Sequence, residues 1–323
     1  MRYTTIPNTD LVVSVLSLGT AEAGGNFDRA TAFAMLDAFI EQGGNFVDTA
    51  HVYNDWLPGE RSRSEKLIGA WMHQPGRRSR PGVLIASKGA HPDLSSMQVG
   101  RLSPAEIQTD LEESLRFLQV DTIDLYWLHR DDSNRPVEEI IDTLEGQVRA
   151  GKIRYYGCSN WQLGRIMAAQ RYAAQRGTRG FAGVQNLWSL AKPNLAEIMR
   201  RDPTLVVMDD ALWQYHRQSG LAAIPYTSQA NGLFQKMDAG ALPPGLSRQY
   251  LSAETEGRYQ RLKQLGRQTG LSTTQIGLGW LTSQPFATCA VVGPHSLAQL
   301  QDCLSAADVQ LTPEQVSFLA PGA

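Results

Sequence analysis

One strand, one helix and a second strand follow each other in the stretch IDLYWLHRDDSNRPVEEIIDTLEGQVRAGKIRYYGCSN, residues 123–160. The short apolar run at 123–128 is typical of a buried strand. Apolar residues at helical spacing then predict a helix over 137–150, which Gly151 ends. A second buried strand is expected over 154–158. This stretch therefore predicts one repeat of an α/β fold.

The same alternation continues along the whole chain. Strands are expected at 12–18, 45–48, 83–87, 123–128, 154–158, 182–185, 222–225 and 289–292. The segments between them carry helical patterns, and the segment 232–250, rich in Gly, Pro and Ser, is expected to be a loop. Eight strands alternating with helices predict a (β/α)8 TIM barrel that forms a single domain over residues 1–323, with a short N-terminal β-hairpin. A doubly wound open sheet is the alternative, although no G-x-G-x-x-G follows an early strand.

Composition limits the classes of partner. The chain has 323 residues and a net charge of −2, so no long-range field attracts nucleic acid or an anionic membrane. It has no apolar run of 18 residues, and polar residues interrupt its N-terminus where a signal peptide needs an apolar run. Three cysteines without a C-x-x-C predict a reduced, cytoplasmic protein. Scattered histidines and no H-E-x-x-H indicate no metal site.

Ionisable residues stand at the ends of three consecutive predicted strands. Asp48 ends the second strand, Lys88 follows the third and His129 follows the fourth, with Tyr53 in an adjoining loop. In a barrel of this kind, chemistry occurs at the carboxyl ends of the strands. Taken singly, each residue has an ordinary explanation: a turn cap, a solvated lysine, a buried histidine or an aromatic packed in a loop. Together they predict a catalytic group at one rim.

Six stretches of the sequence resemble the aldo-keto reductases. They occur in family order and span nearly the whole chain: Asn45 to Tyr53, Ile85 to Lys88, Arg101 to Glu106, Ile123 to Arg130, Gly151 to Asn160, and Val291 to Gly293 with Gln299 and Leu300. The resemblance implies an oxidoreductase that transfers a hydride between a nicotinamide cofactor and a small carbonyl or alcohol substrate.

The resemblance gives the four rim residues catalytic roles. Tyr53 is expected to be the general acid or base, and Lys88 to lower the pKa of its hydroxyl. Asp48 is expected to hold Lys88 in place, and His129 to orient the substrate carbonyl. No side chain supplies a hydride, so the hydride must come from the cofactor.

The resemblance also implies a set of cofactor-binding residues. Ser159, Asn160 and Gln185 match the partners of the nicotinamide carboxamide, and Trp188 occupies the position of a stacking aromatic, unless it is a core residue. Gly19 and Thr20 match a turn on the cofactor side, although a simple strand-end turn has the same pattern.

The segment after the eighth strand matches the phosphate-binding part of the cofactor site. Gly293, His295, Ser296 and Gln299 lie here, and the start of a helix favours a phosphate. Ser296 is equally well explained as an N-cap. Because His295 adds a positive charge when protonated and the nearest acid in this segment, Asp302, is almost two turns away, the cofactor is expected to be NADP, with NAD as the alternative.

Other functions remain open at this stage. Some aldo-keto reductase relatives act mainly by binding a partner, so a cofactor-binding regulatory subunit is one alternative. A barrel hydrolase or isomerase that uses Asp48 and His129 is another. The segment Arg130 to Asp132 either contacts a polar substrate or forms a solvated loop. Which carbonyl or alcohol the protein acts on does not follow from the sequence.

Overall fold

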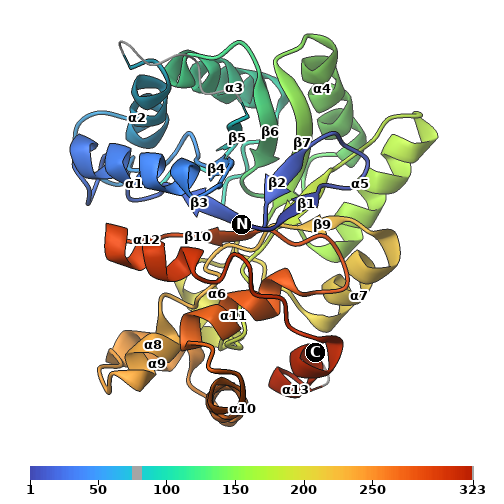
Figure 1. The fold of residues 1–323 in the computed structure, drawn as a ribbon. Helices are drawn as coiled ribbons and strands as arrows, with labels where there is room; N and C mark the ends of the chain where they lie inside the picture. Colours follow the sequence, from blue (N-terminus) through green and yellow to red (C-terminus); the bar gives the residue numbers. More distant parts are fainter. Residues whose placement is uncertain (75–81, 322–323) are drawn as a thin grey trace.

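Eight parallel strands lie at the centre of the molecule, in the order β10, β3, β4, β5, β6, β7, β8, β9 (Figure 1). The structure is a computed structural model that describes residues 1–74 and 82–321. The strand bounds are β3 Leu16–Gly19, β4 Phe46–Asp48, β5 Leu84–Gly89, β6 Ile123–Leu128, β7 Ile153–Ser159, β8 Gly183–Gln185, β9 Ala222–Ala223 and β10 Ala290–Val292. The Cys289 N–H donates to the Ala223 carbonyl over 3.0 Å, and the Val291 N–H donates to the Pro225 carbonyl over 2.9 Å. These bonds join the two ends of the sheet, and the predicted (β/α)8 barrel is confirmed.

Helices connect the strands and surround the barrel (Figure 1). Their bounds are α1 Arg29–Glu41, α2 Arg63–Met72, α3 Pro104–Leu118, α4 Val137–Arg149, α5 Leu163–Gln175, α6 Leu195–Arg201, α7 Asp210–Ser219, α8 Leu233–Asp238, α9 Pro244–Tyr250, α10 Ala253–Thr269, α11 Thr273–Thr282, α12 Leu297–Leu304 and α13 Pro313–Leu319. Helix α3 begins at the capping box of Ser103 and Glu106, with Pro104 in its first turn, so the sequence signal and the helix start agree.

The predicted first strand over 12–18 is divided in two. Its first part is β2, Val12–Ser14, which pairs antiparallel with β1, Tyr3–Thr5, to form a separate hairpin. Its second part, from Leu16, is the barrel strand β3. Val13 of the hairpin packs in one buried cluster with Phe46, Leu125 and Tyr155. The hairpin therefore closes the end of the barrel at which the strands begin, which is the end opposite to the rim with Asp48, Lys88 and His129.

The expectation of a loop over 232–250 is wrong. This segment contains the two helices α8 and α9, which lie beside α10 in Figure 1. Leu233 and Phe234 of α8 are buried, and Pro244 occupies the first turn of α9, a position that suits proline. The Gly and Pro residues of this segment mark helix boundaries, and the apolar residues between them supply the packing.

The pleat of the strands decides which side chains face into the barrel. Successive side chains of a strand point to opposite faces. Phe46, Ala86 and Trp127 belong to the cluster inside the barrel, whereas Val47, Ile85 and Leu128 belong to the cluster beneath the helices. Residues two positions beyond the first three therefore also face inward, at the carboxyl ends of β4, β5 and β6. Those residues are Asp48, Lys88 and His129.

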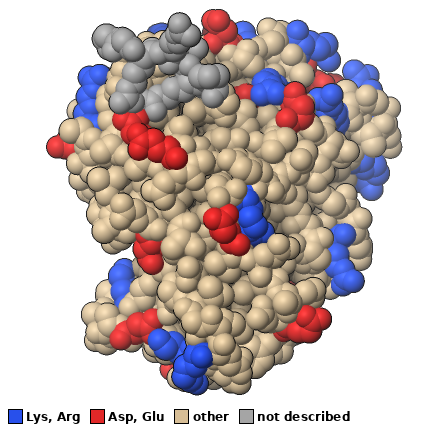
Figure 2. Space-filling view, in the orientation of Figure 1, with Lys and Arg blue, Asp and Glu red and all other residues tan. Residues whose placement is uncertain are grey.

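No helix in the ranges 1–74 and 82–321 is long and apolar enough to cross a membrane. On the face shown in Figure 2, acidic and basic side chains are interspersed rather than gathered into a patch of one sign.

Candidate active site

Lys88 joins two of the other rim residues through direct hydrogen bonds. Its ammonium donates to the Asp48 carboxylate over 2.5 Å, to the Thr49 carbonyl over 2.7 Å and to the Tyr53 hydroxyl over 2.9 Å. Lys88 and Asp48 are each only 1% exposed. A buried lysine needs this number of partners, because an unpaired charge in such a place is costly. The three residues therefore form one unit at the rim.

The electrostatics of Tyr53 differ in part from the sequence-based expectation. Burial raises the pKa of the Tyr53 hydroxyl, Lys88 opposes this rise, and the pKa remains above its ordinary value. The expected net lowering of the pKa is therefore wrong for the protein without a ligand, although Lys88 acts in the expected direction. Burial lowers the pKa of Lys88, but Asp48 and Tyr53 more than offset it, so the pKa is raised. Tyr53 is thus protonated and Lys88 charged at neutral pH.

His129 lies close to Tyr53, with a distance of 6.0 Å between the ring centroids. Burial, together with the neighbouring His91 and Arg130, lowers the pKa of His129 well below its ordinary value. The imidazole is therefore neutral at physiological pH and carries one N–H. The rings of His91 and His129 are 4.7 Å apart, and Nδ1 of His129 has no hydrogen-bond partner among the described residues.

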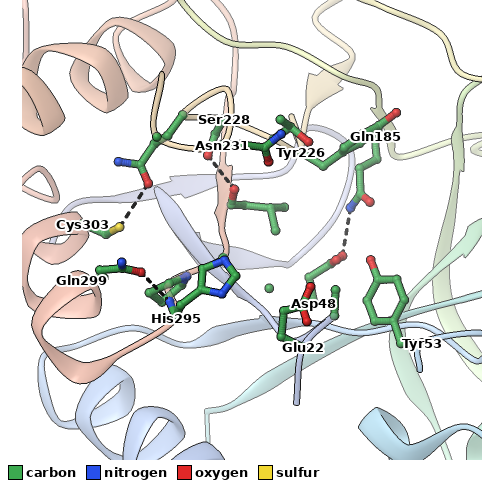
Figure 3. Close-up of a pocket in the computed structure, with 18 of the residues that line it drawn as sticks. Glu22, Asp48, Tyr53, Gln185, Tyr226, Ser228, Asn231, His295, Gln299 and Cys303 are labelled. Atoms are coloured by element: carbon green, nitrogen blue, oxygen red, sulfur yellow. Dashed lines mark hydrogen bonds between the residues drawn. The ribbon is translucent and has the colours of Figure 1, made fainter. Parts of the chain in front are cut away.

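A cavity of about 840 Å³ extends from these residues to the start of α12 (Figure 3). In this view, Asp48, Tyr53 and Gln185 lie toward one end, and His295, Gln299 and Cys303 lie toward the other. The volume is within the range of small-molecule and cofactor sites. A long cavity with catalytic-type side chains at one end and a helix start at the other suits an extended ligand such as a dinucleotide.

Six of the predicted cofactor residues line this cavity: Gly19, Ser159, Gln185, Gly293, His295 and Gln299. Gln185 donates its amide N–H to the second carboxylate oxygen of Asp48 over 2.9 Å, and the Ser159 hydroxyl donates to the Gln185 carbonyl over 2.7 Å. The Gln299 side chain accepts from the His295 N–H over 2.7 Å. These residues offer hydrogen-bonding groups at both ends of the cavity, as a nicotinamide dinucleotide requires.

The expected stacking role of Trp188 does not fit the structure. Trp188 is 6% exposed and is not among the residues that line the cavity. It packs against Trp280 and Phe286, with ring centroids 5.4 and 6.1 Å away, so it is a core aromatic. Tyr226 is an aromatic residue that does line the cavity, and its hydroxyl bonds to Asn160, the neighbour of Ser159. The sequence signal for it was its place just after the predicted strand at 222–225.

Three further predicted cofactor residues are not among the residues that line the cavity. The Asn160 carboxamide oxygen accepts from the Tyr226 hydroxyl over 2.7 Å, so Asn160 positions that ring. The Thr20 hydroxyl donates to the Asp48 carbonyl over 2.9 Å. The Ser296 hydroxyl accepts from the Gln299 N–H over 3.2 Å and is the N-cap of α12, the simpler of the two explanations.

Four further charged residues, Arg130, Lys236, Glu22 and Asp302, contribute to the lining of the cavity. Sequence reasoning missed Glu22 and Lys236, and it left open whether Arg130 contacts a polar substrate. The sequence places Asp302 almost two turns from the expected phosphate, but residues three apart share one face of a helix, and Asp302 lies on the α12 face of the lining residue Gln299. Lys236 lies in the segment expected to be a loop, which is why no role was assigned to it.

A closed barrel with a long cavity at the carboxyl ends of its strands defines a class of enzymes that act on small molecules. The model of the aldo/keto reductase family matches residues 15–320, and the chain belongs to this family. It is an enzyme, an aldo-keto reductase that uses a nicotinamide cofactor.

Individual relatives agree with this assignment. The uncharacterized oxidoreductase YrpG of Bacillus subtilis is 31% identical, over 99% of this chain and 95% of its own length. An NADP(+) aryl-alcohol dehydrogenase of Phanerodontia chrysosporium is 27% identical, over 97% of this chain and 83% of its own length. The solved structure of the thermostable aldo-keto reductase Tm1743 has the same fold, with a TM-score of 0.73, 22% identity and coverage of 99% and 98% of the two chains.

Proposed function

We propose that this enzyme reduces the carbonyl group of an aldehyde or ketone to an alcohol, with Tyr53 as the proton donor. The observation that carries the proposal is the 2.9 Å hydrogen bond from the Lys88 ammonium to the Tyr53 hydroxyl at the wall of the cavity. When bound, the nicotinamide cofactor supplies a hydride to the carbonyl carbon. The Tyr53 hydroxyl gives its proton to the carbonyl oxygen, which completes the alcohol.

The neighbouring side chains prepare Tyr53 for this step. Its raised pKa keeps the proton on the hydroxyl until a carbonyl oxygen accepts it. As negative charge develops on the phenol oxygen, the Lys88 ammonium stabilises it, and Asp48 keeps Lys88 charged and fixed. The neutral imidazole of His129 donates an N–H to the carbonyl oxygen and orients the substrate.

NADP is the cofactor that we propose, with NAD as the alternative. His295 and Lys236 line the cavity, and both favour an additional phosphate when they are charged. The carboxylates of Glu22 and Asp302 in the same lining act in the opposite direction. We therefore propose a modest preference for NADP. We further propose that residues 1–323 act as one domain and that the enzyme works in the reducing cytoplasm, which its three free, buried cysteines support.

Deuterium transfer from the cofactor tests the proposed reaction. NADPH that carries deuterium on the reactive nicotinamide carbon is mixed with an aromatic aldehyde and the enzyme. The product alcohol should then contain one deuterium on the former carbonyl carbon. Product formation without deuterium would contradict direct transfer from the cofactor.

A further inference from the structure

Arg130 is a buried cation at the wall of the cavity, and no role in the proposed reaction accounts for it. It follows His129 directly, and both residues line the cavity together with Tyr53. Arg130 is only 8% exposed. Burial of a charged guanidinium is costly unless hydrogen-bond acceptors or an opposite charge pair with it.

The partners of Arg130 satisfy part of its hydrogen-bonding capacity. The guanidinium donates to the His129 carbonyl over 2.9 Å, to the Thr204 hydroxyl over 2.7 Å and to the Asp202 carboxylate over 3.0 Å. A guanidinium has five N–H donors. The other two have no acceptor among the residues that the structure describes. Asp202 and Thr204 are not part of the cavity lining, whereas Arg130 is.

The acidic side chains of the cavity do not neutralise Arg130. Asp48 is bonded to Lys88 and Gln185. Glu22 accepts from the Asn26 amide, and Asp302 accepts from the Thr274 hydroxyl. Lys88 is not among the lining residues, so Arg130 is the cation of the lining beside Tyr53 and His129, and the carboxylate that pairs with it, Asp202, lies outside the lining.

We propose that Arg130 binds a carboxylate carried by the carbonyl substrate, so that the enzyme acts on oxo acids or carboxylated aldehydes. The proposal rests on the proposed carbonyl reduction and names its substrate class. A carboxylate accepts two parallel N–H groups from a guanidinium, and such paired bonds are short and directional. The substrate carbonyl then lies at Tyr53 and His129, and its carboxylate lies at the adjoining Arg130.

Matched pairs of acids and esters test this assignment. The probes are 2-, 3- and 4-carboxybenzaldehyde and their methyl esters, reduced with NADPH at constant ionic strength. The wild type should prefer at least one acid over its ester in kcat/KM. Arg130→Gln should reduce this acid-to-ester ratio about 10- to 100-fold, as expected for loss of a hydrogen bond between charged groups. The kcat/KM for the esters should change less than the kcat/KM for the acids.

Asp202→Asn is the matched control for a purely structural role of Arg130. Both variants break the ion pair between Arg130 and Asp202, so a structural role predicts the same effect for both. Our assignment predicts opposite effects, because Asp202→Asn leaves the guanidinium in place without its counter-charge and should raise the acid-to-ester ratio. Equal ratios in the wild type and Arg130→Gln would overturn the assignment.

Calorimetric titration with benzoate in the presence of NADP separates this inference from the proposed reaction. The wild type should bind benzoate more tightly than benzamide, and Arg130→Gln should lose most of that difference. If no aldehyde is reduced but benzoate binding depends on Arg130, the proposed reaction fails and the anion site stands. If the wild type binds benzoate no better than benzamide, the anion site is contradicted.

Discussion

The Gln185 amide donates to the Asp48 carboxylate over 2.9 Å and so connects two residues that are 137 positions apart in the chain. The other Asp48 oxygen accepts from Lys88. Both oxygens of the buried carboxylate are therefore occupied, which fixes its orientation. Gln185 lines the cavity as well, so one side chain supports the Asp48–Lys88 pair and faces the region where a cofactor would bind.

Lys88→Met should weaken the proton transfer in both directions. Without the ammonium, the Tyr53 phenolate loses its main stabilising charge, so the pKa of Tyr53 rises further. In alcohol oxidation, where the phenolate is the base, the pH–rate profile should shift to higher pH and the maximal rate should fall. Lys66→Met makes the same substitution at a partly exposed ion pair with Glu60 and is the matched control. An unshifted profile at full rate would remove Lys88 from the mechanism.

His129 should stay neutral across the assay range. Burial and the neighbouring His91 and Arg130 lower its pKa well below the ordinary value. Carbonyl reduction should therefore show no step between pH 6 and pH 8 that depends on His129. Nitrogen NMR of the imidazole, assigned with His129→Gln, measures its protonation directly. A ring that titrates close to the ordinary histidine pKa would contradict the proposed neutral donor.

Glu65 predicts a pH dependence of stability that is unrelated to catalysis. Burial raises the pKa of this carboxyl to about 7, although the electrostatic interaction with His51 and the hydrogen bond from Ser87 oppose the rise. The folded protein thus retains a proton that the unfolded chain releases above the ordinary Glu pKa. The contribution of Glu65 to the free energy of unfolding should be complete below about pH 4.5. It should be lost as the pH rises to about 7, and the loss should amount to at most about 3 kcal/mol.

Urea unfolding at pH 5 and pH 8 measures this contribution. Glu65→Gln cannot ionise, so the difference in unfolding free energy between the two pH values should be smaller in the variant than in the wild type. An unchanged difference would mean that Glu65 titrates alike in the folded and unfolded states.

Binding of both cofactors tests the proposed preference for NADP. The Kd values for NADP and NAD are measured at the same pH and ionic strength, and NADP should bind more tightly. Lys236→Met should reduce this preference, because it removes a cation from the cavity lining. Tighter binding of NAD by the wild type would refute the choice of NADP.

The barrel and three of the rim residues could be predicted from regular patterns in the sequence. Strand patterns that alternate with helical patterns predict the barrel, and the alternation of side chains along each strand predicts the rim residues. Asp48, Lys88 and His129 each lie two positions beyond an inward-facing residue at a strand end, so the pleat alone places them together. Tyr53 lies in a loop, so the pleat does not place it. Its position shortly after the second predicted strand made it a candidate, and the resemblance gave it the role of acid or base.

Part of the cavity lining could not be predicted because long connections form it. Trp188 and Tyr226 both follow predicted strands, and only the tertiary packing decides that Trp188 meets Trp280 while Tyr226 reaches the cavity. For Arg130 the sequence left two alternatives open, contact with a polar substrate or a solvated loop, because an arginine after a strand fits both. Its contacts with Asp202 and Thr204 join segments more than 70 residues apart.

Tyr53→Phe tests the central claim most directly, because it removes only the hydroxyl that gives the proton to the substrate. The measurement is kcat/KM for NADPH-dependent reduction of an aldehyde, with the Kd for NADPH determined on the same samples. We predict that kcat/KM falls by roughly 10²- to 10⁴-fold, the usual contribution of general acid catalysis, while the Kd for NADPH changes little. Near-normal reduction by Tyr53→Phe would contradict the account, because the substrate would then receive its proton from another group.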